Sequence, residues 1–73
     1  PPATADEVEG FFAQLSELLE RSGFARDSTY AGTLRDLRQL CARAAPSARE
    51  VAILRGVCRR LGHAITRSDP RAR

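Results

Sequence analysis

Arginines at helical spacing form the most distinctive chemical pattern in this sequence. On a helix, residues four apart share a face, and one such row would contain Arg55, Arg59, His63 and Arg67. Earlier in the chain, further arginines flank an apolar stripe, at positions 35, 38 and 43. The planar guanidinium group donates two parallel hydrogen bonds and therefore suits phosphate. If the two arginine-bearing helices are adjacent and antiparallel, one phosphate-binding surface is expected, formed by Arg35, Arg38, Arg43, Arg55 and Arg59.

The charges are distributed unevenly along the chain. Five of the nine acids lie in residues 1–20, whereas all twelve arginines follow, and the sequence has no lysine. Such asymmetry indicates a polyanionic partner, or simply solvated faces in a protein that uses arginine for lysine. A more conservative interpretation of Arg38 and Arg55 is that they pair with acids such as Asp36 or Glu50. The acidic first helix is expected to face away from the arginines.

Residues suited to catalysis or metal binding are scarce. His63 is the single histidine, and no carboxylate stands at helical spacing to orient it, so we expect it to be solvated. Cys41 and Cys58 fall on apolar helix faces, and with one histidine they cannot complete an ordinary four-ligand zinc site. We therefore expect no catalytic residues, no metal and no cofactor in this chain, with both cysteines buried and reduced, as in a cytoplasmic protein. No apolar run is long enough to span a membrane.

The helical spacing of the apolar residues, together with the capping and helix-breaking residues between the stretches, predicts three helices. The expected fold is all-α, a small three-helix bundle. The first begins at the N-cap Thr4, with Glu7 completing a capping box, and ends at Gly23 in a left-handed C-cap. The second spans residues 30–44, capped by Ser28 or Thr29. The third begins at Ser47, with Glu50 completing another box, and runs to Thr66. Residues 1–3 are expected to end a linker, residues 4–67 to form the domain and residues 68–73 to be a disordered tail.

The apolar positions predict how the helices pack. The short turn at Pro46 makes the second and third helices spatial neighbours. Phe24 should fold back on Leu19, and close approach of a helix or ligand would explain Gly56 in mid-helix. The side chains expected to be largely buried are Phe11, Leu15, Leu37, Leu54 and Leu61.

Three motifs resemble one known family in order and spacing. The first is Glu7-x-x-x-Phe11 followed by Ser22-Gly23-Phe24, and the second is Leu34-Arg35-x-Leu37-Arg38-x-Leu40 with Arg43-Ala44. The third is Glu50-x-x-Ile53-Leu54-Arg55-Gly56. Together they resemble the C-terminal helical extension of the SpoU-type (SPOUT) tRNA 2′-O-methyltransferases of the TrmJ kind, over most of residues 5–61.

The resemblance implies a role as a C-terminal accessory domain. The parent enzyme would carry an N-terminal methyltransferase domain that binds S-adenosylmethionine, forms a homodimer and methylates a ribose 2′-hydroxyl of tRNA in the cytoplasm. The helical extension would help to hold tRNA. The family-matching arginines are Arg35, Arg38, Arg43 and Arg55.

Two alternatives lie outside RNA binding. The domain could be a docking or dimerisation module that packs on the catalytic domain, in which case Ile53 and Val57 would be exposed on the isolated domain. A helix-turn-helix DNA binder is the other alternative, although the third helix lacks the asparagine and glutamine that commonly accompany arginine in base readout.

Overall fold

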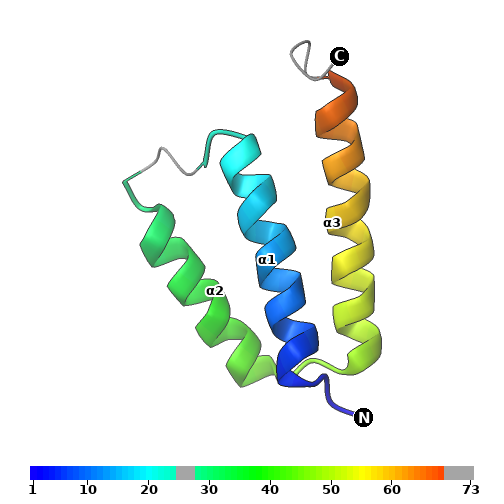
Figure 1. Ribbon diagram of the computed structural model, residues 1–73. Coiled ribbons are helices and arrows are strands. Elements are labelled where there is room, and N and C mark those ends of the chain that lie inside the picture. The colour runs from blue at the N-terminus through cyan, green and yellow to red at the C-terminus, as the bar shows by residue number, and fades with distance from the viewer. Residues whose placement is uncertain (25–27, 69–73) are drawn as a thin grey trace.

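The computed structural model describes residues 1–24 and 28–68, and within these residues three helices joined by short turns make up the fold (Figure 1). Helix α1 spans Ala5–Arg21, α2 spans Tyr30–Ala44 and α3 spans Ala48–Ser68. This confirms the predicted all-α fold. The bounds of α2 agree with those predicted, and α3 extends two residues beyond the predicted Thr66. The expected tail lies outside the described residues apart from Ser68.

The helix ends follow from local capping chemistry. The Thr4 hydroxyl accepts from the Glu7 amide at 3.1 Å, while the Glu7 carboxylate accepts from the Thr4 amide at 2.7 Å. Ser47 and Glu50 make the same reciprocal pair at the start of α3, at 3.1 and 2.7 Å. Gly23 has a φ of 89°, the left-handed conformation expected at its position. Both predicted capping boxes are therefore confirmed.

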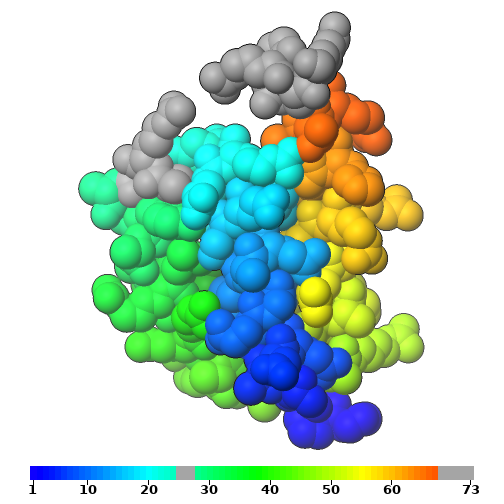
Figure 2. All heavy atoms as spheres, viewed as in Figure 1, coloured from blue at the N-terminus to red at the C-terminus, as the bar shows by residue number. Residues whose placement is uncertain are grey.

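The three helices form a thin layer with α1 between α2 and α3 (Figure 1). The principal extents of the molecule are 41 × 27 × 14 Å, so the layer is little more than one helix thick. Helix α3 packs against α1 along its length. The prediction that α2 and α3 pack as neighbours is therefore wrong except near the Pro46 turn, because α1 occupies the position between them. In the space-filling view, α1 covers the centre of one face (Figure 2).

The core joins the inner faces of α1 and α3. Its buried side chains are Phe11, Phe12, Leu18, Val51 and Cys58. Burial of Phe11 is confirmed, and Leu15 and Leu37 are half-buried against this cluster. The predicted burial of Leu54 and Leu61 is wrong, since these side chains are 37% and 53% exposed. A single layer of helices covers only part of the wide apolar arc of α3, so its outer edge faces solvent.

The N-terminal residues are hydrogen-bonded to the turn between α2 and α3. The Ala3 amide donates to the Pro46 carbonyl at 3.0 Å, and the Ala48 amide donates to the Pro1 carbonyl at 3.1 Å. Pro2 and Ser47 form an antiparallel bridge between these two bonds. Residues 1–3, which the sequence suggested as the end of a linker, thus run antiparallel to the start of α3.

One aromatic contact lies at the end of the layer where α1 ends and α2 begins. Phe24, which we expected against Leu19, meets the ring of Tyr30 edge to face, with centroids 6.1 Å apart. This contact joins the end of α1 to the start of α2. Thr29 occupies the N-cap position of α2 without a side-chain cap hydrogen bond.

Candidate nucleic-acid interface

Arg38 of α2 is held by α1. Its guanidinium donates to the Glu9 carboxylate at 2.6 Å and lies over the ring of Phe12, 4.5 Å from the centroid. The hydrogen bond from Arg38 holds the pKa of Glu9 below its ordinary value. The prediction that the acids of the first helix all face away from the arginines is therefore wrong for Glu9. The sequence predicted that Arg38 pairs with an acid such as Asp36 or Glu50. The observed partner is Glu9 of α1.

Arg55 of α3 also reaches α1. Its Nε donates to the Gln14 side-chain oxygen at 2.7 Å. The guanidinium group lies beside Gly10, where an added Cβ would come within 2.8 Å of Nη1. A glycine at position 10 thus leaves room for the Arg55 head group. Arg38 and Arg55 consequently brace α1 from α2 and from α3, each through a hydrogen bond to a side chain of α1.

The remaining predicted arginines are exposed on two different helices. Arg35 and Arg43 lie on α2, and Arg59 lies on α3. Within residues 1–24 and 28–68, none of the three forms an ion pair. Because α1 lies between α2 and α3 (Figure 1), Arg35 and Arg43 lie on a helix that is separated from the helix of Arg59 along most of its length.

A basic cluster occupies the C-terminal half of α3. Its members line one open surface hollow of about 370 Å³ and are all exposed: Arg59, Arg60, His63 and Arg67. Exposure of His63 agrees with the sequence prediction. Arg60 was missed, although it stands three residues before His63 and seven before Arg67, so helical spacing alone would have found it. Three guanidinium groups and an imidazole thus converge where an anion could be bound.

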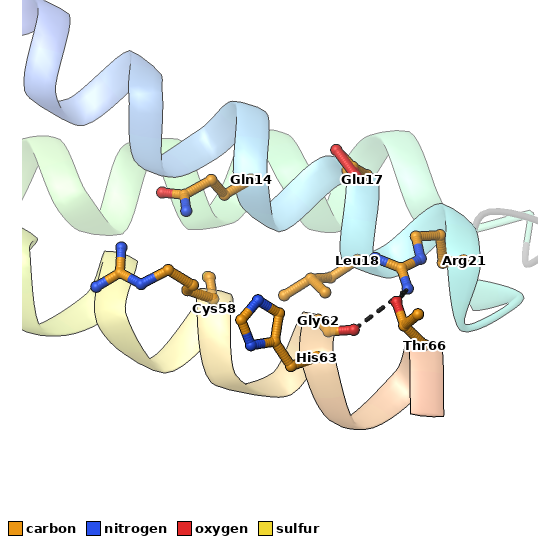
Figure 3. Close-up of a pocket in the computed structure, with 9 residues that line it drawn as sticks. Gln14, Glu17, Leu18, Arg21, Cys58, Gly62, His63 and Thr66 are labelled. Carbon is orange, nitrogen blue, oxygen red and sulfur yellow. Dashed lines mark hydrogen bonds between the residues drawn. The ribbon is translucent and has the colours of Figure 1, made fainter. Parts of the chain in front are cut away.

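A second hollow, of about 200 Å³, lies between α1 and α3 (Figure 3). Arg21 crosses its end, donating to the Gly62 carbonyl at 3.2 Å and to the Thr66 hydroxyl. Gly62 is the point of close approach, since a Cβ there would meet Leu18 at 3.4 Å, whereas the space beside Gly56 is open apart from Arg59. The helix approach that the sequence suggested at Gly56 is therefore found at Gly62 instead, and the alternative of a ligand at Gly56 stays a prediction.

The cysteines do not offer a reactive centre. Cys58 is buried in the core, and burial raises the pKa of its thiol, so the thiolate nucleophile is disfavoured. Cys41 is half-buried beside the core. Among the described residues, no group of three His, Cys, Asp or Glu side chains is arranged to hold a metal ion. No described helix combines the length and hydropathy needed to cross a bilayer.

Comparison with known proteins identifies the family. Residues 6–70 match the family described as the tRNA methyltransferase TrmJ, C-terminal domain. A tRNA (cytidine/uridine-2'-O-)-methyltransferase TrmJ of Yersinia pestis (strain Pestoides F) is 39% identical over 57 residues, covering 78% of this chain and 22% of its own length. Similar relatives from Pectobacterium atrosepticum and Salmonella typhimurium are 37% and 35% identical over 57 residues, again 78% of this chain and 24% of each relative.

The match covers the C-terminal domain of the family. The chain spans less than a quarter of the length of these curated relatives. No solved structure matches it. Because the family model covers nearly the whole chain, this chain belongs to the family of TrmJ tRNA methyltransferase C-terminal domains.

Proposed function

We propose that this chain is the non-catalytic accessory domain of an S-adenosylmethionine-dependent tRNA ribose 2′-O-methyltransferase and that it helps to bind tRNA. The relatives are named as tRNA (cytidine/uridine-2'-O-)-methyltransferases, which supports tRNA as the substrate. In this proposal, S-adenosylmethionine binds to the N-terminal methyltransferase domain of the parent enzyme. The family resemblance implies that this enzyme is a homodimer in the cytoplasm.

The observation that carries the tRNA proposal is the basic cluster of α3. Arg59, Arg60 and Arg67 are exposed, and in the described part of the chain they make no ion pair that would compete with phosphate. Arg35 and Arg43 would add contacts if the RNA extends across the layer to α2. Arg38 and Arg55, which match the family motif, are better suited to hold α1 in place.

The cluster is suited to the RNA backbone rather than to bases. Sequence-specific recognition of single-stranded RNA commonly stacks bases on aromatic side chains. The one tyrosine, Tyr30, is half-buried against Phe24, and the basic cluster contains no phenylalanine, tyrosine or tryptophan, so His63 is its one aromatic ring. The proposed role is therefore to raise the affinity of the enzyme for tRNA, with selection of the nucleotide made elsewhere.

Charge reversal tests this role on the 73-residue chain. Arg59→Glu combined with Arg60→Glu should lower tRNA affinity at least tenfold, measured by filter binding with duplex DNA as competitor. Arg49→Glu, compared with Arg60→Glu alone, is the matched control, because it makes the same single charge reversal near the opposite end of α3 and lies outside the proposed RNA contacts. Equal losses in these two single variants, with helicity unchanged by circular dichroism, would show that net charge rather than the cluster binds tRNA. No loss in the double variant would contradict the RNA-binding role, and preferential binding of the duplex DNA would favour the helix-turn-helix alternative.

A further inference from the structure

Large apolar side chains form an exposed strip on α2 and α3. Its members are Leu40, Ile53, Leu54, Val57 and Leu61, which we call the apolar strip, and each is between 37% and 54% exposed. A groove of about 490 Å³ runs between the two helices at the turn end of the strip, lined by Leu40, Cys41, Ala44, Pro46, Glu50, Ile53 and Leu54. Contiguous apolar surface of this kind on a small domain commonly marks an interaction site.

The geometry of the strip suits a helix. Ile53, Val57 and Leu61 follow one another at intervals of four, so they form a ridge that runs about 12 Å along α3. Leu40 and Ala44 of α2 form the opposite wall near the turn. Ridges of this spacing pack against the grooves of a partner helix. Glu50 is the one charged side chain that lines the groove, so the occupant must present an apolar face.

The start of the chain lies beside this groove. The backbone of Pro1 and Ala3 is hydrogen-bonded to Ala48 and Pro46, and Pro46 itself lines the groove. A polypeptide joined to residue 1 would therefore emerge next to the first turn of α3. Such tethering gives an effective concentration in the millimolar range over a short linker, which favours a preceding segment over a free partner.

We propose that the apolar strip docks an amphipathic helix from the polypeptide that precedes residue 1 in the full-length methyltransferase. The relatives are more than four times as long as the matched segment, which leaves ample chain for such a helix. The occupant presents apolar side chains to Ile53, Val57 and Leu61. Docking fixes the orientation of α2 and α3 relative to the catalytic part of the enzyme, and it is independent of whether α3 binds RNA.

Cross-linking in the full-length enzyme identifies the occupant. A photoactivatable benzoylphenylalanine in place of Leu61 should form an intrachain cross-link, which mass spectrometry should locate before residue 1. The same group in place of Ala52, which is exposed on another side of α3, is the control and should give no such product. A cross-link between two chains at position 61 would make a second copy the occupant and overturn the proposal. Absence of any protein cross-link would also overturn it.

A charge placed in the strip provides an independent test. Ile53→Asp with Val57→Asp should release the domain in the full-length enzyme, raising the rate of limited proteolysis near residue 1 at least tenfold. Ala52→Asp adds a charge to an exposed position on the same helix and should leave that rate unchanged. The milder Ile53→Ser with Val57→Ser guards against unfolding, and helicity is checked by circular dichroism. A folded strip variant that is cleaved at the native rate would contradict docking.

Discussion

Replacing Phe12 with alanine tests the assignment of the core. Phe12 is 1% exposed, its ring centroid lies 5.0 Å from that of Phe11, and Arg38 lies over its face. Truncating a buried phenylalanine costs about 3–5 kcal/mol. The cation–π contact at this partly exposed site adds about 0.5–1 kcal/mol and joins α2 to α1. For 73 residues the total free energy of unfolding is roughly 4–11 kcal/mol, so the variant should lose a large part of its stability.

Leu61→Ala is the matched comparison, because Leu61 is apolar but 53% exposed. Full burial of a leucine contributes about 1.5–3 kcal/mol, so this half-exposed residue should lose about half of that, roughly 0.7–1.5 kcal/mol. Leu54→Ala, at 37% exposure, should likewise cost less than the value for a fully buried leucine. Urea denaturation followed by far-ultraviolet circular dichroism gives the free energy of unfolding. Equal losses for Phe12→Ala and Leu61→Ala, or a Phe12→Ala loss below about 1.5 kcal/mol, would refute this assignment.

Three further substitutions test the backbone and the ion pair. Ala45→Gly should raise the free energy of unfolding by up to about 1 kcal/mol, because Ala45 ends α2 at a left-handed φ of 48°; no gain in urea denaturation would contradict this. Gly56→Ala should also raise it, by about 1 kcal/mol, because a Cβ meets open space there; a lower melting temperature would reveal hidden packing. Arg38 holds the pKa of Glu9 low, so the pair stabilises the fold above the ordinary glutamate pKa, and this contribution is lost as the pH falls through the lowered value. Denaturation at several pH values should therefore show the native protein losing its advantage over Glu9→Gln in acid, and a constant difference would argue against the pair.

Local signals explain why the helices could be predicted from the sequence. Thr4 with Glu7 and Ser47 with Glu50 specify two helix starts through neighbours three residues away, and Gly23 supplies a left-handed stop. The order in which the helices lie in space depends on long-range packing. The wide apolar arc of α3 predicted contacts with both other helices. In the structure, Val51 and Cys58 pack in the core beside α1, whereas Leu61 is exposed to solvent.

The arginines show the same limit at the candidate site. Spacing placed Arg55 and Arg59 on one row of α3, but it could not reveal that Arg55 bonds to Gln14, 41 residues earlier in the chain. Nor could it reveal that Glu9 binds Arg38 across the layer. Helical spacing did contain the information for Arg60 and Arg67, since both project near His63.

The salt dependence of tRNA binding tests the RNA-binding role most directly. If the three arginines of the basic cluster each meet a phosphate, log affinity should fall with log salt at a slope of roughly −2 to −3, taking the single-strand and duplex coefficients as bounds. Arg59→Glu with Arg60→Glu leaves Arg67 alone, so the slope should fall to about −1 or shallower, while Arg49→Glu should leave it unchanged. A slope that is unchanged by reversing Arg59 and Arg60 would contradict the claim that this part of α3 holds tRNA.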